Sequence, residues 1–126
     1  MTKKILLDTN FLTAPFQLDF DIFAELERLY GRYELYTLDD AVQEAKSIEE
    51  GKYGDLVEKL IEKKDIEVME TTGEGDVDHL IVKLSEGFVT ATNDKELKNR
   101  VLGQGRELVI VRSGNHLEKV NEQHLK

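Results

Sequence analysis

Five carboxylates stand where predicted secondary-structure elements begin or end, and their chemistry sets them apart from the other acids. Asp8 ends the apolar run in ILLDTN, and Asp94 closely follows the stretch FVTAT. Asp76 and Asp78 lie at the start of an apolar helical pattern, and Glu44 lies about one turn into another. Clustered oxygen ligands of this kind are what hard divalent cations require. Each aspartate also has an ordinary explanation, because Asp is favoured as a helix N-cap.

The elements that must position these acids alternate between strands and helices. This alternation predicts an α/β fold, a three-layer α/β/α sandwich around a central, mostly parallel sheet of about five strands. We expect residues 1–112 to form the domain, and the polar residues 113–126 to be a C-terminal tail or short helix of the same domain. The predicted strands are Lys3–Leu7, Tyr33–Thr37, Ile66–Met69, Phe88–Thr92 and Glu107–Val111. The predicted helices are about Asp19–Tyr30, Leu38–Ile48, Tyr53–Lys64, Val77–Gly87 and Asp94–Leu102, with a loop at 71–76.

The predicted sheet would bring the acids together. Ligands of such sheets gather at the carboxyl ends of the strands, where the strand order switches. Asp8 and Asp94 follow strands at this edge, and Glu44 reaches it if its helix packs beside the first strand. Their joint position favours a metal site over a set of unrelated caps.

The motifs ILLDTNFL, DHLI and TATNDKELKNR, the last followed by ELVIV, resemble those of PIN domains from Lys3 to about Arg112. The sequence looks especially like small archaeal PIN proteins related to rRNA-processing nucleases and to toxin endoribonucleases. The resemblance implies an endoribonuclease that uses Mg²⁺ or Mn²⁺ to cleave single-stranded RNA. It also implies that four acids bind the metal and support catalysis: Asp8, Glu44, Asp78 and Asp94.

Two aspartates compete for the third position of this set. The family's helix reads Asp, any residue, then two aliphatic residues, which Asp78 satisfies through Leu80 and Ile81. Counting back from Asp94 favours Asp76 instead. We choose Asp78, because a short turn at residues 86–87 can absorb the difference in length.

Other polar residues near the acids suit supporting roles. Metal ions would activate water and relieve charge on the phosphate, while carboxylates fix their geometry. Thr9, Asn10, Thr92 and Asn93 would hold those carboxylates, although a structural role is as reasonable for Asn93.

Contacts to the RNA are harder to place, because the net charge of −9 opposes the usual basic footprint of a nucleic-acid binder. A local basic rim could contact phosphates, and a solvated salt-bridged helix face explains the same residues equally well. The candidates are Lys46, Lys95, Lys98 and Arg100. The histidines lack metal-ligand spacing, so we interpret them as surface or structural residues: His79, His116 and His124.

Other functions fit less well. A haloacid-dehalogenase-type phosphatase needs a second Asp two residues after Asp8, where Asn10 stands, and a response-regulator receiver needs a late Lys where Arg112 stands. The serious alternative is a catalytically silent PIN fold that binds RNA or assists ribosome assembly. Toxin and rRNA-processing roles stay open, with an antitoxin or a ribosome-assembly factor as the corresponding partner.

Two further expectations concern partners and location. A homodimer could form through apolar residues around Pro15, which could equally pack over the sheet: Phe11, Leu12, Phe16 and Leu18. No apolar run approaches the roughly 20 residues that a membrane-spanning helix needs, and no signal-peptide pattern is present. The lack of cysteine suits a reducing cytoplasm.

Overall fold

A computed structural model describes residues 2–71 and 75–121. His124, the end of the predicted tail and the middle of the predicted loop at 71–76 lie outside these residues. None of the helices in the described part of the chain is long and apolar enough to cross a membrane. The elements are β1 (Lys3–Leu7), α1 (Thr9–Thr13), η1 (Ala14–Phe16), α2 (Ile22–Tyr30), β2 (Tyr33–Leu38), α3 (Asp39–Ser47), η2 (Ile48–Gly51), α4 (Gly54–Lys63), β3 (Glu67–Met69), α5 (Val77–Leu84), β4 (Val89–Ala91), α6 (Lys95–Gly103), β5 (Leu108–Arg112) and β6 (His116–Val120).

Within the described residues, six strands form one sheet in the order β3-β2-β1-β4-β5-β6. The first five are parallel, and β6 is antiparallel to β5. Strand β1 lies between β2 and β4, so the strand order switches beside it. Its residues Ile5, Leu6 and Leu7 are fully buried, as expected of a strand covered on both faces.

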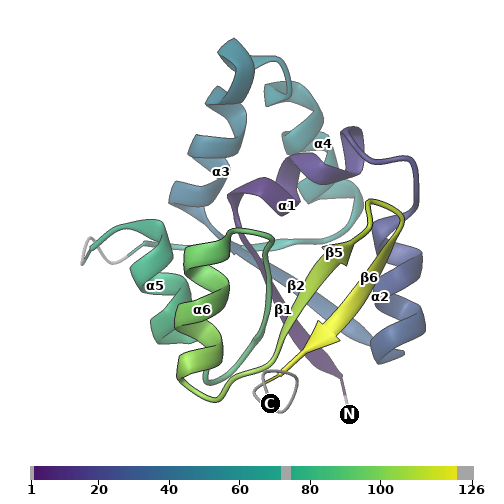
Figure 1. Cartoon of the computed structure of the whole chain (residues 1–126). Helices are drawn as coiled ribbons and strands as arrows, with labels where there is room; N and C mark the ends of the chain where they lie inside the picture. The colour runs from purple at the N-terminus through teal and green to yellow at the C-terminus, as the bar shows by residue number, and fades with distance from the viewer. Residues whose placement is uncertain (1, 72–74, 122–126) are drawn as a thin grey trace.

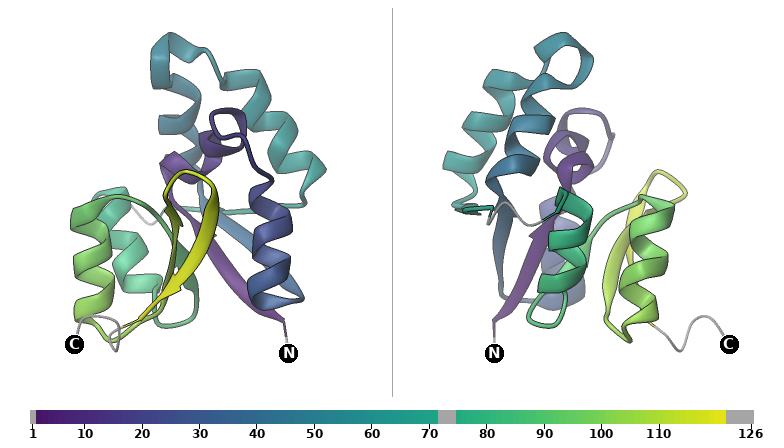
Figure 2. Two further views of the ribbon diagram at one scale, coloured as in Figure 1. Left: turned by 45° about the vertical axis from the view of Figure 1, so that its right-hand side comes forward. Right: turned by 90° about the vertical axis from the view of Figure 1, so that its left-hand side faces the viewer.

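The helices complete the layers that the sequence predicted, which confirms the three-layer α/β/α fold. Helix α2 packs on β2 and β6, while α5 and α6 lie side by side on the other side of the molecule (Figure 1). Helices α1, α3 and α4 extend beyond the carboxyl ends of the parallel strands, as the two further views also show (Figure 2). The carboxyl edge of the sheet is therefore framed by helices.

The segment after β1 differs from the sequence prediction, which placed no helix there. The backbone turns at once into α1, where Phe11 and Leu12 are buried in the core. Phe16 and Leu18 pack against that core, and the Phe16 ring stacks on Tyr53 at 6.2 Å between ring centres. These side chains pack within the chain, as the alternative to a dimer contact predicted, and the homodimer itself stays a prediction.

The segment after Ser113 is also different from the predicted tail or short helix, because residues 116–120 form β6. Ser113 and Gly114 both adopt positive φ angles, as tight hairpin turns require. The Leu117 side chain is fully buried, while its backbone N–H and C=O face the free edge of the strand. The N–H donates to the Glu25 carboxylate at 3.0 Å, and the C=O accepts from the Arg28 guanidinium at 3.3 Å, both on α2. These two side chains close an edge that would otherwise be open to pairing.

Candidate functional site

All four predicted acids line one cleft of about 390 Å³ at the carboxyl edge of the sheet. They come from four different parts of the chain: the end of β1, helix α3, helix α5 and the start of α6. The cleft therefore lies where the strand order switches, as expected for ligand sites in such sheets. Its lining consists of Asp8, Thr9, Asn10, Glu44, Ser47, Ile48, Asp78 and Asp94.

Asp8 is buried at the base of this cleft, with 4% of its surface exposed. Its carboxylate caps α1, because Oδ1 accepts a hydrogen bond from the backbone N–H of Phe11 at 2.8 Å. Its own N–H donates to the carbonyl of Ala91 in β4 at 3.1 Å. Asp8 is thus both a helix cap and a cleft-lining acid, so the two interpretations from sequence do not exclude each other.

Thr92 connects Asp8 to Asp94. Its buried hydroxyl donates to Oδ2 of Asp8 and accepts a hydrogen bond from the backbone N–H of Asp94 at 3.0 Å. Asp94 in turn caps α6, since its Oδ1 accepts from the N–H of Leu97 at 2.8 Å. The neighbouring Asn93 pairs instead with the backbone of Val111 through both polar atoms of its amide, which is a structural role.

Glu44 is exposed, and a threonine from the first helix orients it. The hydroxyl of Thr9 donates to Oε2 of Glu44 at 2.8 Å. Helices α1 and α3 pack against each other, which brings the two residues together across 35 positions of sequence. The packing of α3 against α1, the helix that directly follows β1, therefore brings Glu44 to the cleft.

The structure separates the two competing aspartates at the start of α5. Asp76 is the N-cap of that helix, and its Oδ1 accepts from the N–H of His79 at 2.8 Å. Asp78 lies in the first turn and lines the cleft, whereas Asp76 is not among the lining residues.

The acids influence one another electrostatically. Burial is the largest cause that raises the pKa of Asp8 to about 6. The negative charges of Asp78 and Asp94 also raise this pKa, while the hydrogen bonds from Thr92 and Phe11 lower it. The pKa of Asp78 is also raised, by burial first and then by Asp94. Loss of water and crowded negative charge both favour protonated carboxyl groups. A cation in the cleft would relieve this repulsion.

The donor set of the cleft fits a hard divalent ion, because its polar side chains present oxygen atoms, apart from the amide nitrogen of Asn10. Within residues 2–71 and 75–121, however, no three acidic or histidine side chains approach closely enough to form a preformed ion cage. Carboxylates repel one another when no cation lies between them. Ion binding would therefore require the side chains to converge.

The structure places the residues of the predicted basic rim on different surfaces. Lys46 forms an ion pair with Glu58 of α4 and does not line the cleft. Arg100 faces α5. Its positive charge lowers the pKa of Asp78, but burial and the neighbouring acids raise that pKa by more. Lys95 and Lys98 lie on other sides of α6, because residues two and five positions before Arg100 point away from it around a helix.

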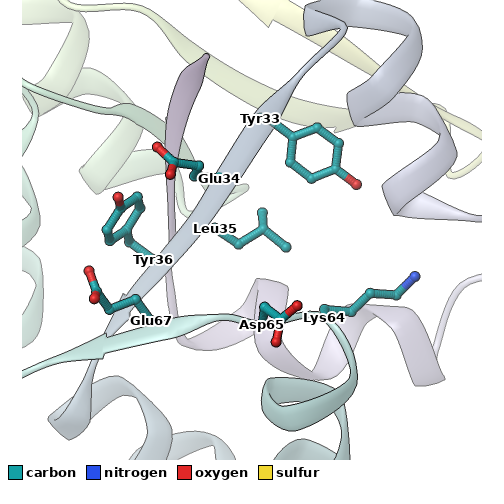
Figure 3. Close-up of a pocket in the computed structure, with 7 residues that line it drawn as sticks. All are labelled: Tyr33, Glu34, Leu35, Tyr36, Lys64, Asp65 and Glu67. Atoms are coloured by element: carbon teal, nitrogen blue, oxygen red, sulfur yellow. The ribbon is translucent and has the colours of Figure 1, made fainter.

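A second cavity, of about 470 Å³, lies at the opposite end of β2 from the acids (Figure 3). Tyr33 and Tyr36 of β2 line it together with Lys64 from the end of α4. The Tyr33 hydroxyl donates to the carbonyl of Phe23, and the Tyr36 ring packs edge-on against Phe88. These contacts identify both tyrosines as packing residues.

Comparison with known proteins agrees with the fold. The family model described as "PIN like domain" matches residues 5–114, so this chain belongs to the PIN-like domain family. A search of curated proteins finds no match.

Solved structures show the same fold at low sequence identity. One is the structure of the PIN domain endonuclease Utp24, with a TM-score of 0.75, 21% identity, and coverage of 94% of this chain and 92% of that one. Another is a domain of a functionally unknown protein from Methanocaldococcus jannaschii, with a TM-score of 0.58, 19% identity, and coverage of 89% and 93%.

Proposed function

We propose that this protein is a metal-dependent endoribonuclease of the PIN type that cleaves single-stranded RNA. The observation that carries the proposal is the convergence of Asp8, Glu44, Asp78 and Asp94 on one cleft at the switch in strand order. Membership in the PIN-like family and the fold shared with a PIN domain endonuclease support it. We assign the activity to a reducing cytoplasm, which the lack of cysteine suits.

The four carboxylates would hold Mg²⁺ or Mn²⁺ through their oxygen atoms. Such an ion, when bound, makes water nucleophilic near neutral pH and relieves negative charge on the phosphate. Thr92 fixes the orientation of Asp8 and the start of α6, and Thr9 fixes Glu44. Partners of this kind orient metal ligands and commonly matter for activity nearly as much as the ligands themselves.

Cleavage of an unstructured RNA in Mn²⁺ tests the proposal. We expect the wild-type chain to cleave it and the Asp8→Asn/Asp94→Asn variant not to. A variant with the same loss of two charges on exposed acids outside the cleft, Asp55→Asn/Asp65→Asn, serves as the control and should cleave normally. Equal cleavage by the Asp8/Asp94 variant would show that the activity comes from a contaminant.

The second candidate function is a catalytically silent module that binds RNA or assists ribosome assembly. The open spacing of the acids in the described residues favours it, as does the net charge of −9. Mn²⁺ should raise the unfolding temperature of the wild-type chain and not that of Asp8→Asn if the cleft takes metal. Equal shifts, or none, would favour the silent module. A small antitoxin gene beside this one would identify a toxin rather than an rRNA-processing enzyme.

A further inference from the structure

A basic groove lies between helices α5 and α6, next to the acid cleft. It has a volume of about 650 Å³ and is lined by His79, Val82, Lys83, Glu86, Arg100, Gly103, Gln104 and Arg106. The lining carries three formal positive charges, from Lys83, Arg100 and Arg106, against one negative charge, from Glu86. In a chain with 17 basic and 26 acidic residues this local balance is reversed.

Helical geometry explains why these residues share one surface. His79, Lys83 and Glu86 recur at intervals of four and three along the chain and lie on one face of α5 or just beyond its end. Gly103 and the C-cap Gln104 follow Arg100 by three and four positions, which places all three residues on one side of α6. The two helices lie side by side (Figures 1 and 2). The residues named above line the groove between them.

One end of the groove lies next to the acid cleft. His79 of the groove directly follows Asp78 of the cleft, and Arg100 is close enough to Asp78 to act on its pKa. At the other end, Glu86 and Arg106 also line a hollow of about 460 Å³ that contains Lys3 and Lys4. Arg100 lies at the cleft end of the groove and Arg106 at the end shared with this hollow, so the positive charge is spread along the groove.

We propose that this groove binds the sugar–phosphate backbone of the single-stranded RNA whose scissile bond lies in the acid cleft. The proposal rests on the proposed function for its choice of ligand. Charges spread along a line suit successive phosphates of a strand better than one small anion, and Lys and Arg are the usual donors to phosphate oxygens. The groove also explains how a chain of net charge −9 could bind a polyanion, because the favourable potential is local.

Gly103 gives a way to alter the groove without disturbing the packing of the helices. A Cβ atom added there would meet no other atom within 4 Å, and the backbone at this position is ordinary helix. Gly103→Glu should therefore place a carboxylate in the groove of a folded protein. Gly103→Gln is its uncharged match.

The experiment measures how salt affects binding of a short fluorescein-labelled oligouridylate in metal-free buffer, so that cleavage does not interfere. The logarithm of the binding constant falls with the logarithm of salt concentration by about 0.7 for each phosphate contact to a single strand. Lys83→Gln/Arg100→Gln should reduce this slope by about 1.4. The control, Lys59→Gln/Lys63→Gln, removes two exposed charges from α4 and should leave the slope unchanged. Gly103→Glu should weaken binding more than Gly103→Gln.

Each outcome decides the proposal separately from the nuclease activity. An unchanged slope in the groove variant, an equal reduction in the control, or no RNA binding by the wild-type chain would overturn the groove. Cleavage in Mn²⁺ with an unchanged slope would leave the nuclease and remove the groove. A reduced slope with no cleavage would keep the groove and refute the nuclease.

Discussion

Asp8→Asn tests the electrostatics of the cleft most directly, through a gain in stability rather than a loss. The pKa of Asp8 is about 6 in the folded chain, against an ordinary value of 3.8, chiefly because the carboxyl group is buried. This difference is worth about 3 kcal/mol, since one pKa unit corresponds to about 1.4 kcal/mol. At pH values between these two pKa values, the carboxyl group keeps its proton in the folded state and has lost it in the unfolded state. Stability is therefore lost as the pH rises from about 3.8 to about 6, and stays low above that.

The substitution removes this cost and introduces a smaller one. The new asparagine keeps an oxygen to cap α1 through the N–H of Phe11, and Asn is as good an N-cap as Asp. Its amide group, however, cannot accept the hydroxyl proton of Thr92 at the position of Oδ2, a loss of about 1 kcal/mol. We therefore expect Asp8→Asn to stabilise the metal-free chain by about 2 kcal/mol at high pH. Close to pH 3.8, where most of the charge effect is gone, the variant should be slightly less stable than wild type.

Urea unfolding in EDTA, at a series of pH values on both sides of the two pKa values, measures both effects. Asp21→Asn is the matched control, because Asp21 caps α2 in the same way but is exposed. A difference between Asp8→Asn and wild type that does not vary with pH would refute the reasoning, as would an equally large effect in the control. Added Mn²⁺ should then stabilise wild type more than the variant, because a metal that binds only the folded state raises its stability.

Three further predictions concern the site and the sheet edge. Asp78→Asn should abolish RNA cleavage, while Asp76→Asn should leave both cleavage and stability nearly unchanged, because Asn caps a helix as well as Asp does; the reverse result in paired cleavage assays would assign the third ligand to Asp76. Thr92→Val should cost about 1–3 kcal/mol in urea unfolding, because it leaves a buried carboxylate and a backbone N–H without the hydroxyl that joins them, and a neutral effect would mean that water replaces it. Glu25 has its pKa lowered to about 2, first by Arg28, so its contribution is present above the ordinary value of 4.5 and is lost as the pH falls toward 2. Glu25→Gln should therefore flatten the acid side of the stability profile, and an unchanged profile would count against this pairing.

The sequence was sufficient for the elements whose pattern is local. The apolar run of β1 and the helical spacing of Leu80 and Ile81 in α5 are properties of neighbouring residues, and the structure has a strand and a helix there. The sequence was not sufficient for α1, which has only five residues and is held by the burial of Phe11 and Leu12. Helices this short have little stability of their own, so propensity cannot predict them.

Strand β6 could have been found from a signal that composition concealed. The segment is polar overall, which suggested a tail, yet the Ser113–Gly114 dipeptide directly after the apolar run ELVIV is a turn signal that favours a hairpin. What completes the strand is distant in sequence: Glu25 and Arg28 satisfy the outward backbone groups of Leu117. The groove between α5 and α6 was missed for a similar reason, because its charges become neighbours only when the two helices pack together.

The sequence by itself determined which element ends carry carboxylates, because apolar runs and turn residues fix where strands and helices begin and end. Only the tertiary structure decided that Glu44 reaches the cleft through Thr9, that Asp78 rather than Asp76 lines it, and that Asp8 is buried beside two other acids. The physical reason is that burial and charge repulsion depend on distances between residues far apart in the chain. A local pattern indicates which element each residue belongs to, and only packing fixes the distances between residues of different elements.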